Sequence, residues 1–288
     1  MKRKVTFLLG TGRCGSTLVQ RLINFSPQAI IWGEHGGFLN PISTGYFQAL
    51  NNQNLERVVY QQPEHYAPLK IINNRADICN SNISWMNDFS KDSIKSSLKE
   101  FIESIFCSKL PQSISCWGFK EILYGKYKND LSIDMLLEVF PESKNIIIVR
   151  HPLDTIVSMS AAWHGKLIDS IKQNNAPEDI KEFNQLIRQK ALQWATQNEK
   201  LRQYAKKFPD NFTLIKYEEI KTNSLDKIFD FIQLEQPVGI EEIMNKKVYQ
   251  TRTGDRNSFA RELMEPKATK MWNLCEDIAV DFGYREKA

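Results

Sequence analysis

The sequence lacks the features of disulfide-rich, zinc-binding and membrane-spanning proteins. It has 288 residues but only 5 cysteines and 4 histidines, and no two cysteines have C-x-x-C spacing. No apolar run reaches the roughly 18 residues that a membrane-spanning helix needs. The apolar stretch near the N-terminus, residues 5–9, meets glycines and is too short for a signal peptide. We therefore expect no disulfide framework, no metal, no membrane span and a reducing, cytoplasmic location.

An excess of charge of one sign is also missing. Lys and Arg number 38 and Asp and Glu number 34, which leaves a net charge of +4. That excess is too small to argue for a nucleic acid partner, although it suits an anionic ligand. The sequence contains no internal repeat, low-complexity tract or long linker. We expect a single domain over residues 1–288, which is long enough to bury a substantial core.

Short apolar runs alternate with longer stretches in which apolar residues recur at helical spacing. The runs predict strands at 5–9, 29–32, 117–119, 145–149 and 212–215. The periodic stretches predict helices at 16–25, 94–106, 153–163, 180–204, 225–232 and 268–282, the last ended by Gly283. Trp163 and Trp194 fall at helical spacing and are predicted to be core residues. The alternation indicates an α/β fold with a central parallel β-sheet flanked by helices on both faces.

A glycine-rich loop follows the first predicted strand. Residues 10–17 read GTGRCGST, which nearly reproduces the P-loop pattern G-x-x-x-x-G-K-[ST]. Between a strand and a helix, such a loop holds phosphate with its backbone N–H groups and the helix dipole. However, Ser16 replaces the lysine that reaches the β- and γ-phosphates of ATP, and the loop carries Arg13 instead. We expect a P-loop NTPase-like three-layer fold; the alternative for the loop is a tight structural turn.

A second anion site is predicted after the strand at 145–149. Arg150 lies just beyond this buried strand, where a lone arginine needs an anionic partner. Ser158 lies about two turns into the next helix, whose first turn holds Pro152. An arginine with a nearby hydroxyl suits a phosphate. The alternative is a surface ion pair between Arg150 and Asp154.

These motifs resemble those of the sulfotransferase superfamily, whose donor is 3′-phosphoadenosine 5′-phosphosulfate (PAPS). The family's R-S-G-[ST]-T-L loop is similar to RCGSTL at 13–18, and its V-R-x-P-x-D-x-x-x-S segment matches residues 149–158. Residues 214–220 resemble its Y-E-D segment, in which Tyr217 would approach the adenosine. Arg252 and Gly254 loosely match an R-K-G loop that covers the 3′-phosphate in some members. The resemblance implies that the first loop binds the 5′-phosphosulfate, that Arg150 and Ser158 bind the 3′-phosphate, and that 3′-phosphoadenosine 5′-phosphate (PAP) is the product. The residues predicted to bind the donor are Gly12, Arg13, Cys14, Gly15, Ser16, Thr17, Arg150, Ser158, Tyr217, Arg252 and Gly254.

Sulfuryl transfer to a hydroxyl needs a base, a cation and in-line placement of the two substrates. Glu34 and His35 follow the strand at 29–32 and are the candidate bases; the family resemblance favours Glu34. Lys120 belongs to WGFKE at 117–121, which is similar to a G-x-K-[ED] segment of related bacterial enzymes. Lys120 and Arg13 are the predicted cations near the sulfate. A structural ion pair between Lys120 and Glu121 is the alternative.

The sequence thus predicts a PAPS-dependent sulfotransferase acting on a hydroxyl or amide-type nitrogen of a small-molecule acceptor. Residues 38–115 match no segment of the family and, with 164–179, are predicted to be acceptor-side insertions. Their aromatic residues suit an apolar or ring-shaped acceptor. A small natural product is favoured, followed by a sugar or lipid and then by a peptide tyrosine. The other hypotheses are a P-loop kinase using ATP and a non-catalytic nucleotide-binding module. The sequence makes no prediction of the oligomeric state.

Overall fold

The computed structural model describes residues 3–57, 89–127, 129–220, 224–240 and 254–286. The chain divides into two compact units. The first is drawn from residues 1–37, 109–130 and 142–288, and the second from residues 38–108 and 131–141. None of the described helices is both long and apolar enough to span a membrane.

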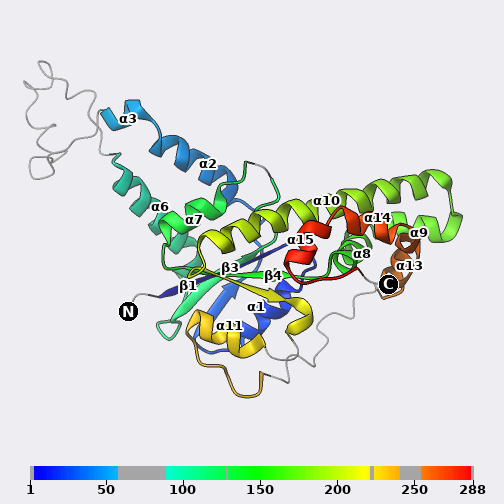
Figure 1. The fold of residues 1–288 in the computed structure, drawn as a ribbon. Helices are drawn as coiled ribbons and strands as arrows, with labels where there is room; N and C mark the ends of the chain where they lie inside the picture. Colours follow the sequence, from blue (N-terminus) through cyan, green and yellow to red (C-terminus); the bar gives the residue numbers. More distant parts are fainter. Residues whose placement is uncertain (1–2, 58–88, 128, 221–223, 241–253, 287–288) are drawn as a thin grey trace, which may run out of the picture. The chain divides into compact units, whose positions relative to one another are not determined.

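The first unit is built on a five-stranded parallel sheet (Figure 1). Its strands are β1 (Lys4–Gly10), β2 (Ala29–Trp32), β3 (Cys116–Glu121), β4 (Lys144–Val149) and β5 (Phe212–Lys216). They lie in the order β2-β3-β1-β4-β5, and each neighbouring pair is parallel. All five contain the strand predicted from an apolar run. Because the strands are parallel, their carboxyl ends share one edge, where α/β proteins bind ligands.

Helices cover both faces of this sheet, which confirms the predicted α/β fold with flanking helices. On one face, strand residues such as Leu8, Ile146 and Ile148 share a core with α1 (Ser16–Asn24) and α11 (Ser224–Ile232). The opposite face is covered by α8 (Pro152–Trp163) and α10 (Pro177–Lys207) (Figure 1). Phe7 and Phe119, which alternate with the first set along their strands, stack there at 4.5 Å between ring centroids.

The remaining helices of the first unit pack around α8 and α10. They are α9 (Gly165–Asn174), α13 (Gly254–Met264), α14 (Ala268–Asn273) and α15 (Glu276–Asp281), with short 3₁₀ turns at Tyr217–Glu219 and Glu265–Lys267.

The single helix predicted at 268–282 is wrong, because the chain turns between α14 and α15. There, the Cys275 N–H donates to the carbonyl of Trp272, and the buried Cys275 thiol donates to Ala191 of α10. This side chain anchors the turn against α10. Gly283, with a φ of +74°, follows α15 as predicted.

The two tryptophans predicted to be core residues differ in burial. Trp194 of α10 is fully buried, as predicted. Trp163 is 45% exposed, so its assignment to the core is wrong. It ends α8, where its ring lies at the surface beside the loop that follows β1. Residues 152–161 of α8 are all buried, and the helix emerges from the core only in its last two residues, the second of which is Trp163.

The second unit is helical in the residues that the structure describes. Its helices are α2 (Leu39–Leu50), α3 (Gln53–Arg57), α6 (Lys91–Cys107) and α7 (Ser132–Val139). Ser90 caps α6 by accepting the Ser93 N–H, and the Tyr46 hydroxyl donates to Glu138 at 2.8 Å. The predicted insertion 38–115 falls largely within this unit, with 58–88 outside the described residues.

Candidate functional site

The loop between β1 and α1 has the backbone of an anion-binding turn. Arg13 and Gly15 adopt the left-handed region, with φ of +63° and +100°. Gly15 precedes α1, and its carbonyl accepts the Leu18 N–H at 2.9 Å. The first turn of α1 therefore faces this loop at the carboxyl edge of the sheet. Its unpaired N–H groups and dipole make it a site for an anion.

Two aromatic rings close against the glycines of this loop. A Cβ on Gly15 would lie 2.2 Å from the ring of Tyr217, and a Cβ on Gly12 would lie 2.1 Å from the indole of Trp163. Neither position can therefore carry a side chain without displacing an aromatic residue. Glycine is required at both because of close packing, and at Gly15 because of its positive φ as well.

Cys14 faces inward from the loop. It is fully buried in the same core as Leu8 and Val19. Burial raises the pKa of its thiol, so Cys14 is a neutral packing residue rather than a nucleophile.

The structure joins the two predicted phosphate sites. The Arg13 Nε donates to the Ser158 hydroxyl at 3.1 Å, and the Arg150 guanidinium donates to the Arg13 carbonyl at 3.4 Å. The Arg150 guanidinium also lies over the ring of Tyr217, 4.7 Å from its centroid. Arg13, predicted as a cation near the sulfate, thus has its side chain at the second site. Among the described residues, Arg150 Nε is buried without a hydrogen-bond partner, as expected for a group that awaits an anion.

Buried contacts hold the Arg150 segment in place. The Trp194 indole donates to the Arg150 carbonyl at 3.2 Å. Glu218 accepts the His151 N–H at 3.0 Å and the Tyr284 hydroxyl at 2.7 Å. The strand end that carries Arg150 is therefore fixed by α10, by the segment after β5 and by the C-terminal segment.

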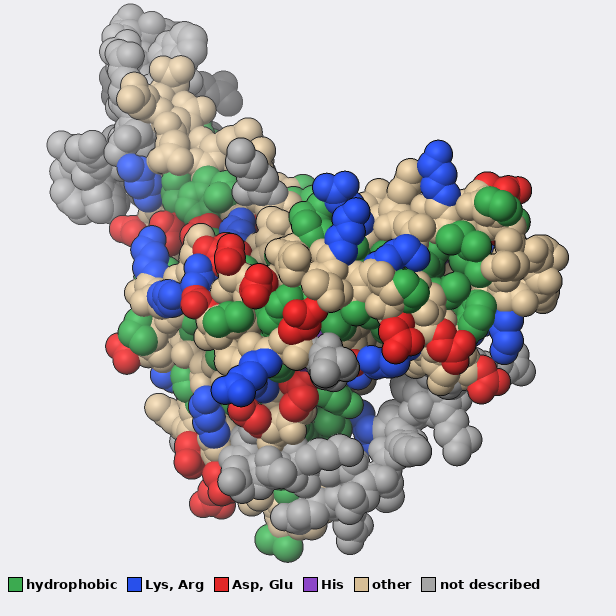
Figure 2. Space-filling view, turned by 45° about the vertical axis from the view of Figure 1, so that its right-hand side comes forward, with side chains coloured by type: hydrophobic (Ala, Val, Ile, Leu, Met, Phe, Trp, Pro, Cys, Tyr) green, Lys and Arg blue, Asp and Glu red, His purple; other side chains and the backbone are tan. Residues whose placement is uncertain are grey.

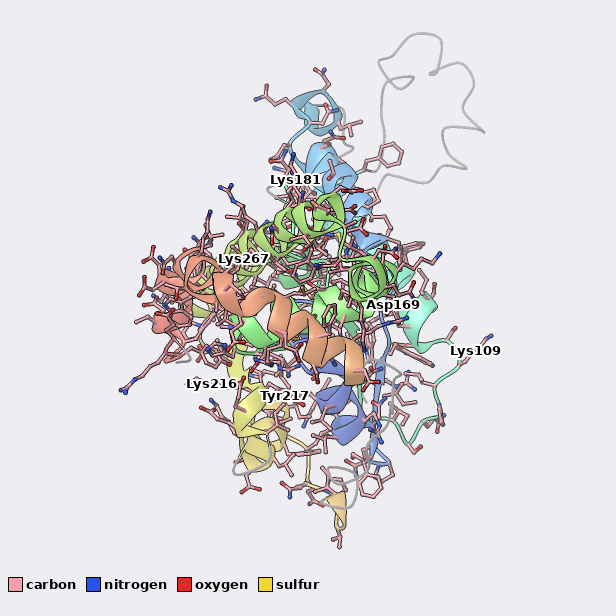
Figure 3. The ribbon with its side chains drawn as sticks, turned by 90° about the vertical axis from the view of Figure 1, so that its right-hand side faces the viewer. Lys109, Asp169, Lys181, Lys216, Tyr217 and Lys267 are labelled. Carbon is pink, nitrogen blue, oxygen red and sulfur yellow. The ribbon has the colours of Figure 1, made fainter. Side chains whose placement is uncertain are left out.

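The side chains predicted to close over the second site are placed only in part. Asp154 pairs with Arg261 of α13 at 2.6 Å, in place of the alternative pairing with Arg150. Gly254 is the first residue of α13, and Arg252 lies outside the described residues. Asp169 of α9 forms an ion pair with Arg256, which ties α9 to α13 (Figure 3).

Lys120 connects the phosphate loop to Glu34. Its ammonium donates to the Thr17 hydroxyl at 3.0 Å and to the Glu34 carboxylate at 2.7 Å. Lys120 is only 6% exposed, whereas the Glu34 side chain is 41% exposed. Three side chains from β3, α1 and the segment after β2 thus meet at the edge of the sheet. The structure brings together a cation, a hydroxyl and a carboxylate beside the predicted phosphate loop.

Glu121 does not form the ion pair with Lys120 that was the predicted alternative. Successive residues of a strand point to opposite faces of the sheet, so the two side chains diverge. The Glu121 carboxylate accepts the N–H groups of the two residues that follow it and that of Gly37 at 2.9 Å. It also lies 3.4 Å from His35 Nδ1. Glu121 therefore holds the segment that carries Glu34 and His35.

His35 belongs to this buried network. Its Nε2 lies 3.0 Å from the Tyr124 hydroxyl, and its ring packs edge-on against Phe119. Burial lowers the pKa of His35, and the nearby Glu121 partly opposes that shift. Of the two candidate bases, Glu34 is the more exposed and the one that touches Lys120.

Gln197 is a site residue that the sequence analysis missed. This fully buried side chain on α10 directs its Nε2 toward the carbonyls of Gly10, Ile122 and Tyr124, at 3.3, 2.8 and 2.8 Å. It links the phosphate loop to the segment after β3. The available signal was a glutamine within the apolar stripe of the helix, between Trp194 and Leu201.

Comparisons with known proteins give a family and two solved structures. A protein-family model described as the sulfotransferase family matches residues 6–237. The chain can be superposed on a crystal structure of a sulfotransferase from Alicyclobacillus acidocaldarius with 14% sequence identity, a TM-score of 0.46 and coverage of 96% of this chain and 97% of that one. It can also be superposed on sulfotransferase STF9 from Mycobacterium avium, with 14% identity, a TM-score of 0.42 and coverage of 93% and 76%. A search of curated proteins finds no match.

Proposed function

The chain belongs to the sulfotransferase family, and we propose that it transfers a sulfuryl group from PAPS to a hydroxyl or amide-type nitrogen of a small-molecule acceptor. The contact that carries this proposal is Lys120, which touches both Thr17 of the phosphate loop and Glu34. A cation and a carboxylate beside an anion-binding turn are the groups that sulfuryl transfer requires.

The donor carries two separated anionic groups, and the first unit offers two anion sites. In our proposal, the loop from Gly12 to Thr17 holds the 5′-phosphosulfate, and Arg150 and Ser158 hold the 3′-phosphate. The unpaired Arg150 Nε and the adjacent Arg13 guanidinium supply positive charge for the 3′-phosphate. Tyr217, whose ring contacts Gly15 and Arg150, lies where the adenosine of such a donor would be held. Arg252 and Gly254 would close over the 3′-phosphate.

Glu34 and Lys120 divide the chemistry between them. A bond forms between the acceptor oxygen and sulfur, the bond from sulfur to the bridging phosphate oxygen breaks, and the acceptor's proton passes to Glu34. Once Glu34 is protonated, its ion pair with Lys120 is lost. The ammonium then stabilises the negative charge that develops on the phosphate, which leaves as PAP. This scheme requires no metal, because the ammonium of Lys120, at the edge of the sheet, supplies the positive charge.

Two other functions are weaker. A kinase using ATP would need the loop lysine that Ser16 replaces. A nucleotide-binding module without catalysis would have no need for a carboxylate beside Lys120, and the 2.7 Å contact between Glu34 and that ammonium therefore favours an enzyme.

Nucleotide binding tests the donor assignment. We expect PAP to bind more tightly than adenosine 5′-phosphosulfate, which lacks the 3′-phosphate. Ser158→Ala should weaken PAP binding by about 1 kcal/mol, the usual contribution of one hydrogen bond, and leave adenosine 5′-phosphosulfate unaffected. Titration calorimetry measures both ligands. Binding of ATP with magnesium in preference to PAP would favour the kinase, whereas PAP binding with no transfer to any acceptor would favour the binding module.

A further inference from the structure

A surface patch of the first unit lies against the phosphate loop at Gly12, whereas Tyr217 contacts Gly15. It consists of Trp163 and His164 at the end of α8, Lys190 of α10 and Lys126 after β3, and we call it the Trp163 patch. The Trp163 indole is 45% exposed and contacts the backbone of Gly12. An exposed indole in this position offers a flat apolar surface next to the proposed donor site.

A positive charge lies over this indole. The Lys190 ammonium lies 5.2 Å from the ring centroid of Trp163, and the Lys126 ammonium lies 5.4 Å from the ring centroid of Tyr127. Across the part of the chain that the structure describes, neither lysine forms an ion pair with a carboxylate. The patch therefore combines aromatic surface with two cations whose charge is not neutralised.

The surroundings of Lys190 make an anion favourable there. Burial lowers the pKa of Lys190, and the charge of Lys126 lowers it further. The pKa of His164 is lowered by burial and then by Lys190, with Glu182 partly opposing the shift. A half-buried cation next to a second cation is costly, and a bound anion would offset both the desolvation and the repulsion.

The Trp163 patch draws its residues from both sides of β1. Arg150 and Tyr217 follow β4 and β5, on one side of β1, and form the nucleotide side of the proposed site. Glu34 and Lys126 follow β2 and β3, on the other side of β1. Trp163, His164 and Lys190 come after β4 in the chain, whereas Lys126 follows β3, so the patch contacts the loop at Gly12 and includes one residue from the side that carries the proposed base.

We propose that the Trp163 patch binds the acceptor, and that the acceptor is a planar aromatic compound bearing a negatively charged group. Its ring packs on Trp163, and its anionic group is held by Lys190 and Lys126. This inference rests on the proposed function and narrows its acceptor to one chemical class.

A matched series of phenols tests the charge preference. The probes are 4-hydroxyphenylacetate, 4-hydroxyphenylacetamide and tyramine, which carry a negative, neutral and positive group on the same ring. Titration calorimetry on the full chain saturated with PAP, and again without nucleotide, should show the anion binding about tenfold more tightly than the amide, as one charge-assisted contact provides. Tyramine should bind most weakly. Equal binding of the three phenols, or no binding of any, would overturn the proposal.

Variants of the two central residues identify the contacts. Lys190→Met should remove the advantage of the anion and leave the affinity for the amide unchanged, while Lys190→Arg should keep most of that advantage. Lys181→Met, an exposed position on the same helix (Figure 3), is the matched control and should change nothing. Trp163→Leu should weaken all three phenols, and Trp163→Phe should restore them. A Lys190→Met protein that still prefers the anion would contradict the assignment.

The affinity for PAP separates this inference from the proposed function. Lys190→Met, whose side chain does not contact the phosphate loop residues assigned to the donor, should bind PAP as the unmodified protein does. If Lys190→Met weakens PAP as strongly as it weakens 4-hydroxyphenylacetate, Lys190 holds the nucleotide, and the acceptor assignment is wrong. If the unmodified protein does not bind PAP, the proposed donor is wrong, and the phenol series measured without nucleotide still reports on the patch.

Discussion

Lys120 has two candidate carboxylate partners, Glu121 and Glu34, and pairs with Glu34. Glu121 is its neighbour in sequence, but the pleat of β3 directs that side chain to the other face of the sheet, where it holds backbone N–H groups. Glu34, which is distant in sequence, reaches the ammonium instead. The proposed base is therefore Glu34, the carboxylate that Lys120 can orient. Glu121 instead positions the segment that carries Glu34.

Replacing the carboxylate of Glu34 tests its role in proton transfer. Glu34→Gln keeps the size of the side chain but cannot accept the proton, so turnover with PAPS and an acceptor should fall by roughly a hundredfold or more. The affinity for PAP should stay nearly constant. Steady-state kinetics and calorimetry measure the two quantities. His35→Gln is the comparison and should cost less, because His35 is held in the buried network with Tyr124. Unchanged turnover in Glu34→Gln would remove the base assignment and leave the family membership intact.

At the scale of elements, contacts of the C-terminal segment support the backbone of the proposed second anion site. Tyr284 is 8% exposed, and its hydroxyl lies 3.2 Å from the Val149 carbonyl and 2.7 Å from Glu218. Burial raises the pKa of this phenol, so the hydroxyl stays protonated and acts as a donor. Glu218 in turn holds the backbone of His151, next to Arg150. The segment after α15 therefore fixes the end of β4 from outside the sheet.

Removing this hydroxyl should affect both stability and nucleotide binding. Tyr284→Phe leaves buried acceptors unpaired and should lower the free energy of unfolding by about 1–3 kcal/mol. PAP affinity should fall as well, since the segment carrying Arg150 loses a support. Urea denaturation and calorimetry measure the two effects. Tyr127→Phe, at a tyrosine that is 57% exposed, is the control and should change neither. A loss of stability with unchanged PAP affinity would show that the Tyr284 contacts do not support the proposed anion site.

At the scale of the whole molecule, the charges are mixed rather than segregated. On the face shown in Figure 2, Lys and Arg side chains are interspersed with Asp and Glu. With a net charge of +4, anion binding must come from local groups such as the phosphate loop and Arg150 rather than from a general positive field.

Two histidines should make the stability of the whole chain depend on pH. The pKa values of His35 and His164 are both lowered mainly by burial. In the unfolded chain these residues take up protons near pH 6.5, so the unfolded state binds more protons below that value. Stability should therefore fall as the pH drops from about 7.5 to 5.5, by at most about 1.4 kcal/mol per pH unit for each histidine.

Urea unfolding of the unmodified chain and of a His35→Gln/His164→Gln variant tests this dependence. The variant should lose less stability over the same pH interval, because the two titrations are removed. The comparison uses the pH slope and not the absolute stability, so a general weakening of the variant does not affect it. Identical slopes in the two proteins would contradict the assignment to these histidines.

At the scale of the whole molecule, the role of the second unit in acceptor binding is still a prediction. The segments 38–115 and 164–179 were expected to be acceptor-side insertions. The second unit takes its residues mostly from the first of these segments. The segment 164–179 begins at His164 and contains α9, which follows the Trp163 patch directly in the chain. The phenol series on the Trp163 patch therefore tests the prediction for the segment 164–179, which begins within this patch.

The sequence by itself determined the local features of this protein. Five apolar runs located the five strands, and the glycines of GTGRCGST located the turn before α1, because strand burial and positive φ leave direct marks on residue choice. The motifs around Arg150 and Tyr217 were recognisable by their resemblance to segments of the sulfotransferase family.

The tertiary structure alone decided which side chains meet. Glu34 and Lys120 are 86 residues apart, and Arg13 and Ser158 are 145 apart. Their contacts follow from the order β2-β3-β1-β4-β5, which no local pattern specifies. The exposure of Trp163 likewise depends on where the core ends, a property of packing between distant elements. Local pattern therefore determined the elements and loops, and long-range packing determined the chemistry at the edge where they meet.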